Sequence, residues 1–198
     1  NKQLNFLQLI YNSLKTNGNA RAAVVLPDNV LFEGGAGAQI RRDLMDKCNL
    51  HTILRLPTGI FYAQGVKTNV LFFDRGMTDK DNTRELWVYD LRTNMPSFGK
   101  RTPLIQKYFE EFMEAYRAEN REEIKDERFN RFTREEIAKK DDSLDIGLIV
   151  DESLSVYDNL PDPIESAEEA ISKLSQARSL LQEVVDELKA IEVKEDGK

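Results

Sequence analysis

Apolar residues at the start of the chain form two different patterns. Leu4, Leu7 and Leu14 recur at helical spacing, and an Asn-Gly-Asn segment at residues 17–19 supplies residue types that end helices. The short, continuous apolar run at residues 22–26 is typical of a strand buried on both faces of a parallel sheet. The chain is therefore expected to begin with a helix followed by a buried strand.

Helices and strands continue to alternate until residue 56, after which two strands follow each other directly. A loop over residues 28–37 leads to a second helix, roughly residues 38–47, and then to strands at residues 50–56 and 69–74. No crossover helix separates these two strands, so they are expected to be antiparallel neighbours. This order predicts an α/β fold, the second half of a doubly wound, Rossmann-like sheet that ends in an antiparallel hairpin.

Farther along, the pattern becomes more polar. Alternation over residues 85–91 predicts an additional edge strand, and residues 103–116 predict an amphipathic helix with an aromatic side. Charged residues dominate positions 118–140, where Thr133 followed by Glu136 favours a short capped helix. The mainly helical carboxyl-terminal region is expected to begin here.

The last predicted helix, about residues 164–193, carries apolar residues at alternating steps of four and three, which is the coiled-coil repeat. We expect it either to pack on its own domain or to dock into a helical bundle with another subunit. The chain then has three parts: an α/β domain at 1–100, a charged helical connection at 101–160 and this assembly helix at 161–198. The residues expected at a subunit interface are Leu174, Leu181, Val184, Leu188 and Ile191.

Composition narrows the class of protein. The 198 residues have a formal net charge of −7, which argues against a freestanding nucleic-acid binder because Lys and Arg supply most non-specific affinity for phosphates. The single cysteine, Cys48, excludes an internal disulfide framework. No apolar run approaches the roughly 20 residues needed to span a bilayer. We expect a cytoplasmic protein that does not associate with membranes.

The loop between the two antiparallel strands carries the candidate chemistry. It spans residues 57–67 and contains Pro57, two glycines and the adjacent aromatic residues Phe61 and Tyr62. Loops that follow strand ends are where open α/β sheets bind ligands. The two rings are expected either to cap the core or to form a stacking platform for a flat ligand such as a base.

Other candidate groups favour structural roles. Gly34, Gly35 and Gly37 lie between a strand and a helix, but their spacing matches no phosphate-binding motif, so a surface loop is favoured over a phosphate cradle. His51 has no Cys or His partner at metal-ligand spacing, and Cys48 beside it is interpreted as a packing residue. The sequence therefore predicts neither a metal site nor a catalytic residue.

Four blocks of sequence carry a resemblance to a known family. They are Ala-Ala-Val-Val-Leu-Pro-Asp-Asn-Val-Leu-Phe at 22–32, Ile-Leu-Arg-Leu-Pro-Thr-Gly-Ile-Phe at 53–61, Gly-Val-Lys-Thr-Asn-Val-Leu-Phe-Phe at 65–73 and Trp-Val-Tyr-Asp-Leu-Arg-Thr-Asn-Met-Pro-Ser-Phe-Gly-Lys at 87–100. The chain resembles the modification (M) subunit of type I restriction-modification systems over most of residues 1–150. That family methylates adenine N6 in DNA with S-adenosylmethionine.

Two motifs of that family do not occur in this sequence. They are the Gly-rich cofactor loop and the Asn/Asp-Pro-Pro-Phe/Tyr tetrapeptide that holds the target amino group. The resemblance therefore implies that this sequence is the C-terminal part of an M subunit. It further implies that the main S-adenosylmethionine site lies upstream and that this piece is inactive alone.

The resemblance also assigns roles to particular residues. Phe61 occupies the place of an aromatic that stacks against the flipped-out adenine, and Tyr62 is a second candidate for the same pocket. Basic residues near the loop are either DNA-backbone contacts or ordinary solvated residues. The candidates for DNA contact are Lys67, Arg92, Lys100 and Arg101.

Partners follow from the same family. M subunits bind a specificity (S) subunit through C-terminal helical segments, usually as two M with one S, and a restriction (R) subunit joins some complexes. Sequence-specific DNA contact then belongs mainly to S, which reconciles the acidic charge of this chain with a DNA function.

Two further readings stay open at this level. One is a noncatalytic assembly module that keeps the methyltransferase scaffold and the bundle helix. The other is a different small α/β enzyme such as a hydrolase, which no nucleophile motif in the sequence supports.

Overall fold

The computed structural model describes most of the chain up to Gly147 and part of its carboxyl-terminal region. The described residues are 1–61, 66–96, 98–99, 101–147, 171, 174–175, 177–182 and 184–185. The chain divides into two compact units, Asn1–Ile149 and Val150–Lys198.

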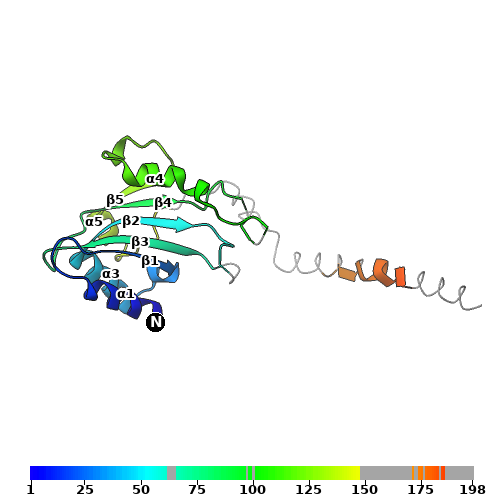
Figure 1. Ribbon diagram of the computed structural model, residues 1–198. Coiled ribbons are helices and arrows are strands. Elements are labelled where there is room, and N and C mark those ends of the chain that lie inside the picture. The colour runs from blue at the N-terminus through cyan, green and yellow to red at the C-terminus, as the bar shows by residue number, and fades with distance from the viewer. Residues whose placement is uncertain are drawn as a thin grey trace, which may run out of the picture. The chain divides into compact units, whose positions relative to one another are not determined.

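A five-stranded mixed sheet forms the centre of the first unit (Figure 1). In chain order its strands are β1 (Arg21–Pro27), β2 (Cys48–Leu56), β3 (Thr68–Arg75), β4 (Glu85–Asp90) and β5 (Phe129–Thr133). Their spatial order is β1-β3-β2-β4-β5; β3 is antiparallel to β1 and β2, β4 is parallel to β2, and β5 is antiparallel to β4. Strands β1, β2 and β4 therefore finish at the same end of the sheet, which we call the carboxyl end.

Helices on one face of the sheet enclose the larger apolar cluster. They are α1 (Lys2–Ser13), α2 (Asn29–Phe32), α3 (Ala36–Lys47) and α5 (Arg134–Ala138). Side chains from these helices pack with Leu50, Ile53, Leu71 and Phe73 of the sheet, all of which are fully buried. Burial of this apolar surface is the main favourable term for the fold.

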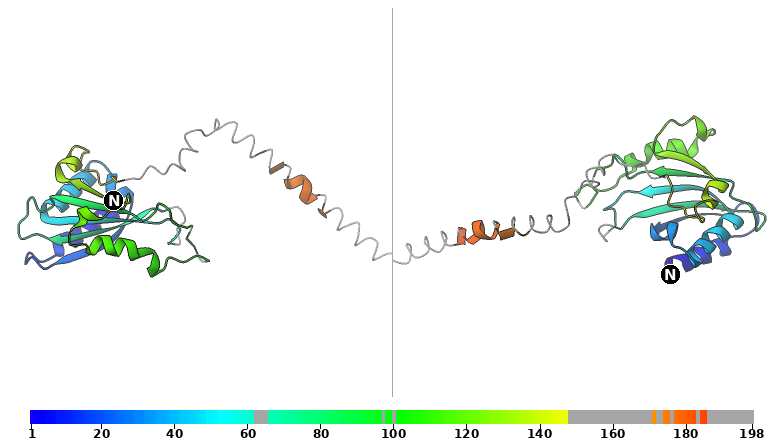
Figure 2. Two further views of the ribbon diagram at one scale, coloured as in Figure 1. Left: turned by 90° about the horizontal axis from the view of Figure 1, so that it is seen from above. Right: turned by 180° about the vertical axis from the view of Figure 1, so that it is seen from behind.

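The opposite face is covered by the segment between β4 and β5. This segment contains the 3₁₀ turn η1 (Gln106–Phe109), helix α4 (Glu110–Arg117) and the 3₁₀ turn η2 (Arg121–Glu123). Phe112 and Ala115 of α4 pack with Leu54, Trp87 and Tyr89 in a second cluster. Figure 2 shows that α4 and α1 lie on opposite faces of the sheet. The α/β fold and the antiparallel hairpin β2–β3 are confirmed.

The first strand differs from its prediction. It is an outer strand of the described sheet, and it pairs with the antiparallel strand β3 rather than with parallel neighbours. Alternate residues are exposed, and Val25 exposes 51% of its surface. The expectation of burial on both faces is wrong here because a run of apolar residues records hydrophobicity and not the number of flanking strands.

The fourth and fifth strands also differ from expectation. β4 is an interior strand rather than an edge strand, because β5 pairs with its outer side. β5 comes from the stretch expected to be a charged helical connection, and its Phe129 stacks on Trp87 with ring centres 4.7 Å apart. Its pairing joins segments far apart in sequence, which local periodicity does not reveal.

The short helix at Thr133 is confirmed. The Thr133 hydroxyl accepts a hydrogen bond from the backbone N–H of Glu136, and the Glu136 carboxylate accepts one from the Thr133 N–H at 2.7 Å. This reciprocal pair, a capping box, satisfies donors that a helix start otherwise leaves unpaired. Within the expected loop at 28–37, by contrast, the structure contains the additional helix α2.

The second unit is described only between residues 171 and 185, where the described residues are helical. Leu174, Leu181 and Val184 expose 69%, 67% and 52% of their surface. Leu188 and Ile191, the other two residues expected at a subunit interface, lie outside the described residues.

Candidate functional site

The candidate site lies at the carboxyl end of the sheet, where a loop over residues 57–67 joins β2 to β3. We call this segment the Phe61 loop; residues 57–61 and 66–67 of it are described. The Phe61 side chain is 45% exposed, so its ring is not a core residue. Val66 and Lys67 on the other side of the loop are also exposed. The exposure of Phe61 favours the stacking alternative over the core-capping one.

Gly59 lets the loop approach a second segment closely. Its φ angle is +80°, and an added Cβ would lie 2.3 Å from the carbonyl oxygen of Phe98. Phe98 is itself buried, and its ring meets the Tyr108 ring edge-on, with the centres 5.0 Å apart. Only glycine fits both this backbone conformation and this contact, so the start of the loop is packed in place.

Arg92 lies just beyond the end of β4 and connects the three strands β1, β2 and β3. Its Nε donates to the carbonyl oxygen of Leu56 at 3.0 Å, and its Nη2 donates to that of Thr68 at 3.0 Å. The same guanidinium forms a two-point pair with Asp28 at 2.6 and 3.1 Å. We call Arg92, Asp28, Asn69 and these two carbonyl groups the Arg92 cluster.

Asp28 is the acidic member of this cluster. Burial opposes its ionisation, but hydrogen bonds from Arg92 and Asn69 and the nearby positive charge outweigh burial and hold the pKa of Asp28 below its ordinary value. The Asn69 amide donates to Asp28 at 2.7 Å, and the Asp28 backbone N–H donates to the carbonyl of Lys67 at 3.0 Å. A charged carboxylate at the end of β1 therefore links to both Arg92 and the far stem of the Phe61 loop.

Arg55 is a second buried arginine near the same end of the sheet. Its side chain is fully buried, and its Nη2 donates to Asp145 at 2.9 Å and to the carbonyl of Ile146 at 2.8 Å. Among the described residues, its Nε and Nη1 have no hydrogen-bond partner. Arg55 thus attaches residues 145–146 to the last residues of strand β2, just before the Phe61 loop.

The structure sorts the sequence-derived candidates for DNA contact. Lys67 and Arg101 are exposed, whereas Arg92 points into its cluster and all three of its side-chain nitrogens donate to partners. Lys100, and with it the second aromatic candidate Tyr62, lies outside the described residues. Sequence reasoning missed Asp28 and Asn69, for which the only signal is a polar residue directly at a strand end.

The glycines between α2 and α3, Gly34 and Gly35, have open surroundings. An added Cβ at Gly34 or Gly35 would meet nothing within 4 Å, so no enclosing surface surrounds them. The surface-loop interpretation of Gly34 and Gly35 is therefore favoured. Two pockets lined by described residues lie beside α4 and at the amino end of β2.

Cys48 and His51 lie at the opposite end of β2 and have structural surroundings. Cys48 is fully buried, and burial raises the pKa of its thiol to about 11. Burial lowers the pKa of His51, which the Asp74 carboxylate 3.8 Å away opposes. No cluster that could hold a metal ion occurs among the described residues.

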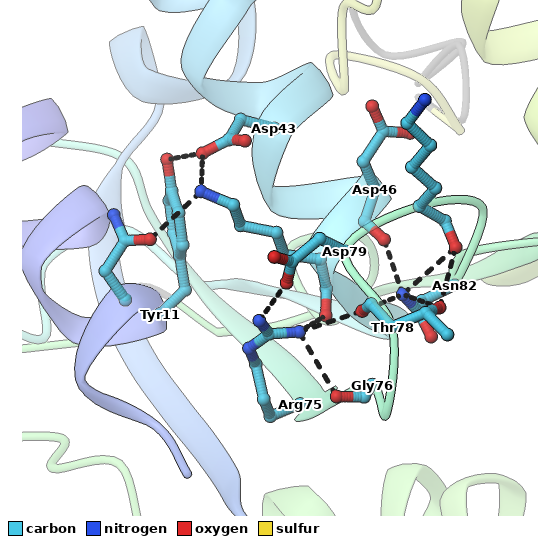
Figure 3. Close-up of polar contacts among 11 residues, drawn as sticks. Tyr11, Asp43, Asp46, Arg75, Gly76, Thr78, Asp79 and Asn82 are labelled. Atoms are coloured by element: carbon cyan, nitrogen blue, oxygen red, sulfur yellow. Dashed lines mark hydrogen bonds and ion pairs between the residues drawn. The ribbon is translucent and has the colours of Figure 1, made fainter. Parts of the chain in front are cut away.

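A second arginine cluster lies at the end of β3 (Figure 3). Arg75 Nη1 donates to the carbonyl oxygens of Lys47, Gly76 and Thr78, and its Nη2 pairs with Asp79. Asn82 in the same turn donates to the carbonyl of Asp46 at the end of α3. We call Arg75 and its partners the Arg75 cluster. Its hydrogen bonds hold the loop at residues 76–84, which follows the end of β3 that is farther from the Phe61 loop.

A mixed sheet with helices on both faces is an α/β architecture, and the Phe61 loop lies at the strand ends where open α/β sheets bind their ligands. A family model for N-6 DNA Methylase matches residues 1–155, and the chain belongs to that family.

Known relatives agree with this assignment. The chain is 49% identical to the methylase subunit of the type I restriction enzyme EcoKI from Escherichia coli K12, over 96% of this chain and 42% of that protein. It is 49% identical to the StySJI methylase subunit from Salmonella typhimurium over the same shares. The chain thus spans less than half the length of these relatives.

Solved structures show the same fold. The crystal structure of the EcoKI M protein matches with a TM-score of 0.69 and 48% identity over 95% of this chain and 44% of that one. A type I methyltransferase subunit from Streptococcus thermophilus matches with a TM-score of 0.55 and 30% identity over 69% of this chain and 27% of that one. None of the helices in the described part of the chain has the length and apolar composition for crossing a membrane.

Proposed function

We propose that this chain is the C-terminal part of the M subunit of a type I restriction-modification enzyme, which methylates adenine N6 in DNA. The observation that carries the proposal is Phe61, an aromatic ring held half-exposed on a loop at the carboxyl end of a family scaffold. The identity of 49% with two type I methylase subunits supports it.

In this proposal the Phe61 ring stacks on the adenine that has been turned out of the duplex. Stacking of a base on an aromatic side chain contributes about 1–3 kcal/mol and needs only an accessible ring face. Tyr62 belongs to the same pocket. Lys67 and Arg101, both exposed, contact the DNA backbone together with Lys100.

S-adenosylmethionine is the proposed methyl donor, and its main site is proposed to lie upstream because the Gly-rich cofactor loop of the family does not occur in this sequence. The bound cofactor supplies an electrophilic methyl group. The chain's own contribution is to hold the base so that adenine N6 faces that group for direct attack, without a covalent intermediate on the enzyme.

The proposed partners are an S subunit, a second M subunit, DNA and, in restriction complexes, an R subunit, all in the cytoplasm. Exposed Leu174, Leu181 and Val184 support a helical surface that binds another subunit. One similar solved structure concerns the assembly of a type I restriction-modification system. The noncatalytic assembly module is the alternative, and the coding sequence upstream of Asn1 decides between them, because only a catalytic subunit needs the Pro-Pro tetrapeptide.

The role of Phe61 is tested in the complete M subunit assembled with its S subunit. Phe61→Leu keeps apolar bulk and removes the ring face, so methyl transfer to target DNA is expected to fall by about 5- to 100-fold. Phe61→Trp keeps a ring face and should retain most activity. Equal activity of the leucine variant and the unmodified enzyme would refute base stacking by Phe61.

The position of the cofactor site is tested on the chain itself by calorimetric titration with S-adenosylmethionine. No heat of binding is expected. Micromolar binding would place the site within these 198 residues and contradict the proposal that upstream residues bind the cofactor.

A further inference from the structure

We propose that Arg92 is a positioning residue that sets the separation and orientation of the two stems of the Phe61 loop. The stems are Leu56, directly before the loop, and Thr68, directly after it. The consequence for catalysis rests on the proposed function of Phe61; the consequence for loop geometry does not.

A single guanidinium contacts both stems. Its Nε donates to the Leu56 carbonyl and its Nη2 donates to the Thr68 carbonyl, each at 3.0 Å. Guanidinium N–H groups lie in one plane at fixed angles, so two such bonds restrict both carbonyls at once. A flexible lysine ammonium has no comparable geometry.

Asp28 completes the arrangement from the third strand. It holds the Arg92 guanidinium at two points, and its own backbone N–H donates to the Lys67 carbonyl. The side chains of Arg92 and Asp28 are only 14% and 23% exposed, so solvent weakens this pair less than it weakens a surface pair. Two consecutive carbonyl groups, those of Lys67 and Thr68, are therefore held, the first by Asp28 and the second by Arg92.

These contacts account for the charge of Arg92 without DNA. Each side-chain nitrogen donates to a protein acceptor, and Asp28 neutralises the cation. Phe61 lies five residues beyond Leu56, and the Gly59 contact with Phe98 restrains the chain between them. A shift of the stem is thereby transmitted to the Phe61 ring.

The Arg75 cluster offers a matched control. Arg75 likewise donates to several backbone carbonyls and pairs with an aspartate, but it holds the loop at residues 76–84. Each loop contains one lysine, Lys67 in the Phe61 loop and Lys80 in the other. Trypsin cleavage after these two lysines therefore reports separately on the two loops.

The first experiment is limited proteolysis of the 198-residue chain with Arg92→Lys or Arg75→Lys, followed by mass spectrometry. Arg92→Lys is expected to accelerate cleavage after Lys67 by about tenfold or more and to leave cleavage after Lys80 within about twofold, because local opening controls cleavage. Arg75→Lys is expected to do the reverse. Equal acceleration at both lysines by Arg92→Lys would mean general destabilisation and would overturn the proposal.

The second experiment measures methyl transfer by the complete M subunit with its S subunit. Arg92→Lys is expected to lower kcat by about tenfold or more while the KM for S-adenosylmethionine stays within about twofold, because only base placement is altered. Arg75→Lys is the control for loss of stability. An unchanged kcat together with faster cleavage after Lys67 would overturn the positioning role, whereas an active Phe61→Leu variant would overturn the stacking function instead.

Discussion

The two outer strands of the described sheet, β1 and β5, end it in different ways. β5 is five residues long, carries Arg131 paired with Glu122 and Glu85, and runs directly into the capped helix α5. β1 is seven residues long and apolar after Arg21. The register with β3 shows that the backbone N–H and C=O groups of Arg21, Ala23 and Val25 point to the side of β1 opposite β3.

Short length, charge and an adjoining helix are the devices with which proteins protect an outer strand from pairing further. β5 has all three, whereas β1 has only the charge of Arg21 at its start. Within the described sheet, the free edge of β5 is therefore protected against further pairing and the free edge of β1 is not.

The largest expected effect compares adjacent proline substitutions in β1. The backbone N–H of Val24 bonds to β3, and its side chain packs against the core. The N–H of Val25 points away from β3. Val24→Pro is expected to lower the free energy of unfolding by about 3 kcal/mol or more, and Val25→Pro by less than about 1 kcal/mol. Urea unfolding followed by the fluorescence of Trp87 measures both.

The comparison of β1 with β5 fails if the two variants are equally unstable, since the outward edge of β1 would then be engaged in the isolated chain.

A smaller effect concerns the carboxylates beside each outer strand, Asp28 after β1 and Asp126 before β5. Burial opposes ionisation of both, but hydrogen bonds from Arg92 and Asn69 to Asp28, and from Arg128 and Tyr89 to Asp126, outweigh burial and lower both pKa values below 3.8. Each carboxylate therefore adds stability that is complete above about pH 4 and is lost as the pH falls through the lower pKa of the folded chain.

Acid titration of stability tests the contribution of each carboxylate. Asp28→Asn and Asp126→Asn should each remove about 2 kcal/mol near pH 6 and give a flatter decline between about pH 4 and pH 2 than the unmodified chain. Circular dichroism during urea unfolding at each pH provides the measurement. A decline as steep as in the unmodified chain would show that the paired carboxylate does not contribute.

The smallest effect tests the helix that closes β5. Thr133→Ala removes the capping hydroxyl and should lower the free energy of unfolding by about 1 kcal/mol, while Thr133→Ser should retain most of it. The same urea experiment measures the difference. If alanine and serine behave alike, the capping box does not stabilise this end of the sheet.

Much of the sheet is predictable from local signals. The apolar runs at 50–56 and 69–74 and the absence of a crossover helix predict the β2–β3 hairpin, and Thr133 with Glu136 predicts the start of α5. The position of β5 is not predictable in this way, because its partner β4 is about 40 residues earlier in the chain.

The sequence draws attention to Phe61, whose exposed ring the structure confirms, but it does not reveal the polar contacts that support the loop. Phe61 stands out because an aromatic residue in a glycine-containing loop has few structural reasons to be there. Arg92, in contrast, looks like a surface cation in the sequence, and only the meeting of three strand ends shows that Asp28 and two carbonyl groups surround it. Such contacts depend on the assembled sheet, which charge patterns along the chain do not record.

The position of β3 between β1 and β2 has a consequence during synthesis on the ribosome. β1 is made first, but its described partner β3 follows only after roughly 40 more residues, which take about 2 to 8 seconds to add at about 5–20 residues per second. Pairing along this edge of β1 therefore has to wait until β3 has been synthesised.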